Sequence, residues 1–208
     1  MKIIIFGASG RTGHYLTRQV LSTGNQVTAF VRNPSRLYVK HENLKVWNGD
    51  ILSNEEVGQA MVGQEAVLFA LGETRTTAPT TMLSDAIKTI IQAMNLQKIK
   101  RILSVGNAGI LQETETALIC QNPTYPQNYN YIIDDHLRVF EAFKKCEMEW
   151  TIVAPPTLID APETKLYRLL ANYLPPNGRQ INTGDIAHFI MNELTAKQFV
   201  NQRVGIAY

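Results

Sequence analysis

The sequence has few cysteines, little excess charge and no long hydrophobic run. Its 208 residues include two cysteines, Cys120 and Cys146, which are too few for a disulfide framework and have no histidine at metal-ligand spacing. We therefore expect a reducing, cytoplasmic compartment. Lysine and arginine total 20 against 18 for aspartate and glutamate, so a net charge of +2 argues against nucleic acid or a membrane surface as a partner. The first apolar run, residues 2–6, is too short for a membrane span or a signal-peptide core.

The composition indicates one folded domain. Hydrophobic residues make up 45% of the chain and charged residues 18%, which is typical of a globular protein. A chain of this length buries roughly 70% of its unfolded surface and needs no disulfide or metal to hold its core. We therefore treat residues 1–208 as a single domain.

Short runs rich in isoleucine and valine alternate with segments of helical periodicity. This alternation favours an α/β fold, a Rossmann-like doubly wound parallel sheet flanked by helices. The expected strands are 2–6, 26–31, 44–48, 66–70, 101–105, 150–153 and 203–207. The expected helices are 11–24, 83–94, 134–146 and 184–194, the last with Thr183 as its N-cap.

Three stretches interrupt the alternation, and each follows an expected strand. They are residues 73–81, 112–131 and 155–182. In an open parallel sheet such connections gather at the carboxyl ends of the strands, where ligands bind. We expect them to be substrate loops, although each one alone is equally well explained as a surface insertion.

A glycine-rich turn follows the first strand and opens the first helix. It reads Gly7-Ala8-Ser9-Gly10-Arg11-Thr12-Gly13. Gly7 allows the tight turn, Gly10 lets the backbone approach a pyrophosphate, and Gly13 permits close helix packing. The helix N-terminus adds free N–H groups and a partial positive charge. The turn therefore predicts a dinucleotide site, with a spacing found in the short-chain dehydrogenase lineage.

The residue after the second strand indicates which dinucleotide binds. An acid at this place usually holds the ribose of NAD, but here the place is taken by Arg32, with Arg36 close behind. An arginine fork matches phosphate geometry, so NADP(H) is favoured over NAD(H). A solvated loop position is the alternative for Arg36.

Two further turns are candidates for cofactor contact. Asp50 and Ile51 follow the third strand, where they could meet the adenine edge, and Leu71 and Gly72 follow the fourth, where backbone could approach the ribose or pyrophosphate. Glycine and aspartate are also ordinary turn residues, so a purely local role is the alternative.

The usual proton-transfer groups are missing from the sequence. None of the eight tyrosines has a lysine four positions on, there is no G-x-S-x-G elbow, and the four histidines lack metal-ligand spacing. Hydride transfer without a fixed acid suits an acceptor that delocalises the incoming electrons. Flavins, quinones and linear tetrapyrroles have this property.

The whole chain resembles the NADPH-dependent flavin reductase and biliverdin-IXβ reductase family, atypical short-chain dehydrogenases close to the NmrA-like proteins. The resemblance rests on the glycine-rich turn and on segments 31–37, 49–51, 71–72 with 79–81, 134–136, 154–156 and 184–189. It implies a monomer that binds NADPH and stacks a planar acceptor, FMN or another flavin and also bilins, on the nicotinamide.

The resemblance also implies roles for individual residues. It places His136 beside the acceptor and the backbone of Pro155 and Pro156 beside the nicotinamide. Asn107 stands where animal members have a serine, and it retains hydrogen-bonding capacity. His136 also has helical spacing to two phenylalanines, so a packed histidine at the start of a helix is an equal alternative.

The loop at 112–131 carries three tyrosines, Tyr125, Tyr129 and Tyr131, that could stack on a planar acceptor. The alternative is that they close the loop over the core.

For the whole protein, the rivals to a flavin reductase are a quinone reductase and an NmrA-like redox sensor that binds NADP without turnover. The small basic cluster of Lys98, Lys100 and Arg101 is expected to be a solvated edge.

Overall fold

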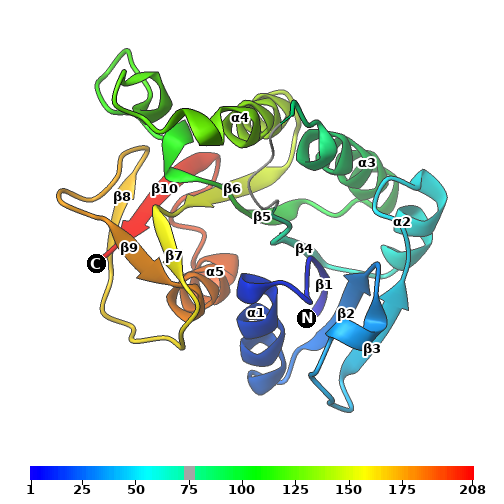
Figure 1. Ribbon diagram of the computed structural model, residues 1–208. Helices are drawn as coiled ribbons and strands as arrows, with labels where there is room; N and C mark the ends of the chain where they lie inside the picture. Colours follow the sequence, from blue (N-terminus) through cyan, green and yellow to red (C-terminus); the bar gives the residue numbers. More distant parts are fainter. Residues whose placement is uncertain (73–77) are drawn as a thin grey trace.

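The computed structural model describes residues 1–72 and 78–208, which form a central eight-stranded sheet (Figure 1). The strand order is β3-β2-β1-β4-β5-β6-β10-β8, and β8 alone among these described strands runs antiparallel to its neighbour. The bounds are β1 Lys2–Phe6, β2 Gln26–Val31, β3 Leu44–Asn48, β4 Ala66–Phe69, β5 Arg101–Val105, β6 Glu149–Ala154, β8 Arg168–Ala171 and β10 Gln202–Ala207. The doubly wound α/β sheet expected from the sequence is therefore confirmed.

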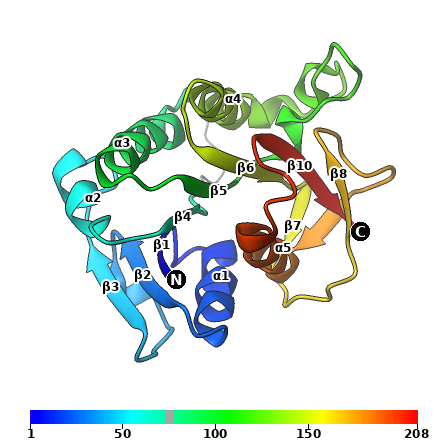
Figure 2. The same ribbon diagram turned by 180° about the vertical axis from the view of Figure 1, so that it is seen from behind.

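Helices cover both faces of the sheet, which is why its central strands are apolar throughout. Ile3 and Ile5 of β1 contribute to the core on one side, while Ile4 and Phe6 contribute to the core on the other. Figures 1 and 2 show α1 and α5 on the first side and α2, α3 and α4 on the second. The helix bounds are α1 Arg11–Ser22, α2 Asn54–Ala60, α3 Met82–Gln97, α4 Asn130–Lys144 and α5 Thr183–Ala196.

Two helix starts differ from the prediction. Helix α4 begins at Asn130 instead of 134, because Ile132 and Ile133 already face the core. Helix α5 begins at Thr183, so the N-cap position belongs to Asn182, and the predicted cap at Thr183 is wrong. Helix α2 was not expected, although Ser53 caps it by accepting a hydrogen bond from the Glu56 N–H at 3.3 Å.

The expected loop at 155–182 contains short strands as well. Strands β7 (Thr157–Ile159) and β9 (Gln180–Asn182) pair in a separate two-stranded sheet, and β8 joins the main sheet. The buried carboxylate of Asp185 on α5 secures the connection, because it accepts hydrogen bonds from the N–H groups of Thr164 and Lys165 at 2.9 and 2.7 Å. The Tyr208 hydroxyl donates to the same carboxylate at 2.6 Å. Residues 155–182 are therefore held in place by strand pairing and by hydrogen bonds to Asp185.

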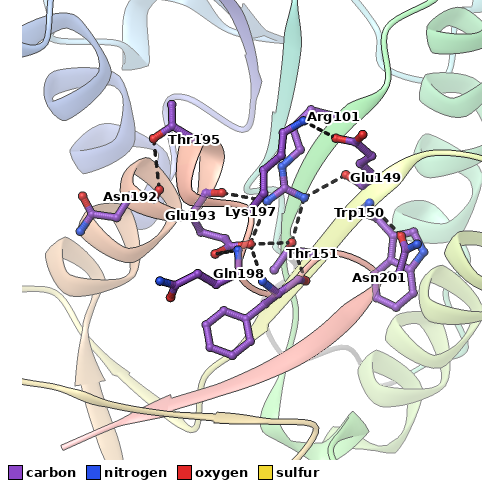
Figure 3. A network of polar contacts seen from close by, with 11 residues as sticks. Arg101, Glu149, Trp150, Thr151, Asn192, Glu193, Thr195, Lys197, Gln198 and Asn201 are labelled. Atoms are coloured by element: carbon purple, nitrogen blue, oxygen red, sulfur yellow. Dashed lines mark hydrogen bonds and ion pairs between the residues drawn. The ribbon is translucent and has the colours of Figure 1, made fainter.

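A buried polar network ties α5 to the start of β5 and β6 (Figure 3). Arg101 donates to the Glu193 carboxylate at 3.1 Å and to the Thr151 hydroxyl at 2.9 Å, and Arg101 is only 5% exposed. The sequence prediction of a solvated edge is therefore wrong for Arg101, because a glutamate far along the chain compensates its charge. The network lies at the amino end of these strands, away from the glycine-rich turn.

The strand order places one topological switch beside the glycine-rich turn. The chain leaves β1 toward β2 on one side and returns to β4 on the other, so β1 and β4 are neighbours at the centre of the sheet. Ligands of such sheets bind where the carboxyl ends of these strands diverge. Among the described helices, none combines the length and apolar character needed to cross a membrane.

Candidate functional site

The glycine-rich turn is packed so closely that side chains would not fit. Gly7 has φ +86°, and a Cβ there would lie 2.6 Å from the Ala70 carbonyl oxygen. A Cβ at Gly13 would lie 2.0 Å from the carbonyl oxygen of Gly7. The Gly10 N–H donates to that same carbonyl at 2.9 Å, which closes the turn. The roles predicted for Gly7 and Gly13, a tight turn and a close helix approach, agree with this geometry.

The first turn of α1 is open to an anion. No side chain caps it, and it contains no acidic residue. Helix α3 differs, because the buried Asp135 carboxylate accepts hydrogen bonds from the N–H groups of Leu83 and Ser84 at 2.8 and 3.2 Å. An internal carboxylate thus occupies the N-terminus of α3, whereas no described side chain caps the N-terminus of α1. The glycine-rich turn and the first turn of α1 together form an open cradle, and the pyrophosphate predicted for it stays a prediction.

The other residues of the turn differ in exposure. Thr12 is buried, Ser9 is half-buried, and Arg11 is exposed at the start of the helix. Of the three, only Thr12 is fixed inside the protein. Ser9 and Arg11 therefore have side chains free to meet a bound phosphate.

Arg32 and Arg36 are exposed beyond the end of β2, the neighbour of β1. Within residues 1–72 and 78–208, neither guanidinium has a hydrogen-bond or ion-pair partner. The turn between them is rigid, because Asn33 accepts a hydrogen bond from the Ser35 N–H at 3.1 Å and caps a short 3-10 helix at Pro34–Arg36. Two positive charges without a described partner therefore stand beyond the end of the strand that neighbours β1, and their role toward a 2′-phosphate stays a prediction.

The turns after β3 and β4 hold four of the residues predicted to contact the cofactor. Asp50 is exposed, and its carboxylate accepts a hydrogen bond from the Leu52 N–H at 3.0 Å, while Ile51 is half-buried. Leu71 is half-buried beside Gly7, and a Cβ at Gly72 would meet nothing described within 4 Å. Space alone therefore does not require a glycine at position 72. The predicted loop residues 73–77 lie outside the described residues.

The turns after β5 and β6 are joined to each other. The Ala108 N–H donates to the carbonyl of Pro155 at 2.8 Å, so Asn107, Pro155 and Pro156 form one wall at the carboxyl edge. Asn107 Oδ1 accepts hydrogen bonds from the Gly109 N–H at 2.8 Å and from the Tyr125 hydroxyl at 3.3 Å. Burial raises the pKa of Tyr125 to about 12, so the hydroxyl keeps its proton.

His136 lies in the second turn of α4, because the helix begins earlier than predicted. Its side chain is 7% exposed, and burial lowers the pKa of His136 to about 4 despite the neighbouring Asp135. The imidazole is therefore neutral near pH 7. This environment agrees with the packed-histidine alternative, and a neutral ring is a weak acid.

The tyrosines of the predicted loop at 112–131 also contact the core. Tyr125 and Tyr129 pack against it, whereas Tyr131 is 39% exposed. Arg203 secures the start of the loop by donating to Gln112 Oε1 at 3.1 Å. Sequence reasoning missed Arg203, and no local pattern distinguishes it. The roles of these residues toward a ligand stay predictions.

Comparisons with known proteins agree with this architecture. A family model described as NAD(P)H-binding matches residues 7–197. The protein YwnB of Bacillus subtilis (strain 168) is 26% identical over an alignment of 216 residues that covers 99% of this chain and 98% of YwnB.

Two solved structures show the same fold. One is a candidate NADH-flavin reductase from Streptococcus pneumoniae TIGR4, with a TM-score of 0.85, 23% identity, and coverage of 100% of this chain and 99% of that one. The other is a short-chain dehydrogenase/reductase from Veillonella parvula DSM 2008 in complex with NADP, with a TM-score of 0.81, 21% identity, and coverage of 100% and 94%.

Proposed function

This chain belongs to the NAD(P)H-binding family, and we propose that it is an NADPH-dependent reductase whose acceptor is a planar conjugated molecule. The first candidate acceptor is a flavin such as FMN, followed by linear tetrapyrroles of the biliverdin type. The proposal combines the uncapped first turn of α1 with two side chains, His136 and Tyr125, that are poorly suited to donate a proton near pH 7.

The preference for NADPH is supported by Arg32 and Arg36. An anionic 2′-phosphate would receive charge-assisted hydrogen bonds from these guanidiniums, and no acid stands there to hold the free ribose of NAD. The structural likeness to a protein that binds NADP agrees with this preference. Gly7, Gly10 and Gly13 would bring backbone to the pyrophosphate.

The choice of acceptor follows from the protonation states of this chain. NADPH supplies a hydride, and a proton from solvent completes the two-electron reduction. His136 is held neutral by burial and Tyr125 holds its proton tightly, so neither is suited to protonate a localised alkoxide. An acceptor that spreads the incoming charge over a ring system needs no such acid. The observation that carries the proposal is therefore the lack of a suitable proton donor at His136 and Tyr125, together with a glycine-rich turn whose helix has no side-chain cap.

The cellular setting is also part of the proposal. Cys120 and Cys146 are both free thiols and neither is exposed, which agrees with a reducing cytoplasm. We propose a monomer with small-molecule partners. The name of one structural relative mentions flavin reduction, and that supports flavin as the acceptor tested first.

The test is a steady-state assay of NADPH absorbance with FMN, a biliverdin and a quinone as separate acceptors. The proposal expects turnover with FMN and faster turnover with NADPH than with NADH. Turnover with the quinone alone would assign the enzyme to quinone reduction. Tight NADPH binding without turnover of any acceptor would contradict the proposal and favour a redox sensor.

A further inference from the structure

The Asn107 side chain is oriented by two donors that approach the same atom. Its Oδ1 accepts from the Gly109 N–H and from the Tyr125 hydroxyl, at 2.8 and 3.3 Å. The amide nitrogen Nδ2 has no hydrogen-bond partner among the backbone groups and side chains that the structure describes, and it is not among the buried unpaired polar atoms. Asn107 therefore has one unused function at the carboxyl edge of the sheet, and that function is a donor.

Tyr125 is suited to hold this orientation. Its ring packs on the core, and its hydroxyl lies 2.8 Å from the place where a Cβ on Gly109 would stand. The hydroxyl stays protonated because burial raises its pKa to about 12. The Gly109 N–H opposes the flipped amide because it can only donate, and the Tyr125 hydroxyl adds a second hydrogen bond that holds Oδ1 on this side.

Asn107 also has a fixed place relative to the next strand. The residue after it, Ala108, donates its N–H to the Pro155 carbonyl at 2.8 Å. This bond joins the Asn107 turn to the turn that follows β6. The backbone at Asn107 is therefore held in place, and the rotation of its amide is controlled by the Gly109 N–H and the Tyr125 hydroxyl together.

We propose that Tyr125 is a positioning residue that, together with the Gly109 N–H, leaves the N–H₂ group of the Asn107 amide free for the acceptor, so that this point of the candidate site recognises a lone pair. The acceptor class is then a conjugated ring system with a carbonyl oxygen or an unprotonated ring nitrogen near the reacting atom. This inference rests on the proposed function and deepens it.

The arrangement also distinguishes the oxidised acceptor from the reduced one. Hydride addition to a ring nitrogen forms an N–H bond from the electron pair of the hydride and moves the π electrons into the ring. The nitrogen then carries a donor and its remaining lone pair is conjugated with the ring, so it accepts a hydrogen bond from the Asn107 amide poorly. Where the amide faces such a nitrogen, the oxidised acceptor binds more tightly than its reduced product. Product release is thereby favoured without any movement of the chain.

The first variant for the test is Asn107→Asp. Aspartate has nearly the same shape and still accepts from Gly109 and Tyr125, but it has no donor. We expect kcat/KM for FMN to fall about tenfold to hundredfold, with most of the change in the KM for FMN and little in the KM for NADPH. Asn107→Ser, which keeps a donor, should restore part of the loss.

The second variant, Tyr125→Phe, tests positioning through a double-mutant cycle. Alone it should lower kcat/KM for FMN by about threefold to tenfold, since one neutral hydrogen bond is lost. In an Asn107→Ala background it should change kcat/KM by less than about twofold. Tyr38→Phe is the matched control, because Tyr38 is 82% exposed and its hydroxyl makes no hydrogen bond to the described residues.

The readout besides turnover is the affinity for oxidised FMN in the presence of NADP⁺, measured by quenching of flavin fluorescence. Asn107→Asp should weaken this binding about tenfold or more, with the thermal midpoint close to that of the wild type. Equal effects of Tyr125→Phe in both backgrounds, or unchanged FMN binding in Asn107→Asp, would overturn the inference. A wild type that binds FMN without turnover would contradict the proposed function, and the binding data would then decide the inference alone.

Discussion

Replacing Arg32 should change the choice of cofactor without harming the fold. Its guanidinium is exposed and has no partner within the described residues, so Arg32→Ala removes no internal contact. Charge-assisted hydrogen bonds to phosphate are about twice as strong as neutral ones, so we expect NADPH affinity to fall about tenfold to hundredfold. Arg32→Asp places a like charge beside the 2′-phosphate and should lower NADPH affinity further. NADH affinity should change by less than about threefold in Arg32→Ala.

The assay is calorimetric titration of each variant with NADPH and with NADH at two salt concentrations. Because the site is exposed, the difference between wild type and Arg32→Ala should shrink as salt rises. Arg36→Ala is the matched comparison, with a smaller expected loss. A variant Arg32→Asp that still prefers NADPH to NADH would refute the assignment of Arg32 to the phosphate.

Four further predictions concern the turn, the buried histidine and the buried ion pair. Gly13→Ala should weaken NADPH binding at least about hundredfold in calorimetry, because the new Cβ would stand 2.0 Å from a backbone oxygen. Gly58→Ala is the control and should leave NADPH binding unchanged, because a Cβ there would meet no described atom within 4 Å. The pKa of His136 falls from 6.5 to about 4 on folding, so the unfolded chain binds the proton at a higher pH than the folded chain does. Urea unfolding should therefore show the free energy of unfolding dropping by about 3 kcal/mol as the pH falls from 6.5 to about 4. The variant His136→Leu should lack this loss. His136→Ala should lower turnover only modestly, and a fall beyond roughly three orders of magnitude would mark it as an essential acid. Glu193→Gln leaves the charge of Arg101 buried without its partner and should cost about 3–5 kcal/mol in the same unfolding experiment, and a neutral result would contradict the network.

Local features of the sequence predicted the parts of the fold that depend on neighbouring residues. The turn at Gly7–Gly13 was predictable because a strand, a spacing and a helix start coincide there. Helix α2 also had a local signal, since Ser53 and Glu56 stand at capping-box spacing, but its seven residues are too few for periodicity to identify. The three short strands within 155–182 have the same difficulty, because strands of three or four residues show no reliable alternation.

Contacts between residues far apart in the chain could not be predicted from the sequence. Asp135 caps α3 from 52 residues away, and Arg101 pairs with Glu193 across 92 residues, so neither partner lies within a local pattern. The Asn107–Tyr125 contact depends on how a loop returns to the wall after β5. The start of α4 was misjudged because no side chain caps it, so its first residue leaves no capping signal.

The most direct test of NADPH-dependent acceptor reduction is an anaerobic mixing experiment with stoichiometric protein, NADPH and FMN. The absorbance of NADPH and of oxidised flavin is followed in one reaction. The account predicts that both chromophores disappear together, one NADPH for each FMN, at a rate well above that of the protein-free mixture. If NADPH binds the protein, as its fluorescence would report, and both chromophores persist at the protein-free rate, the account is contradicted.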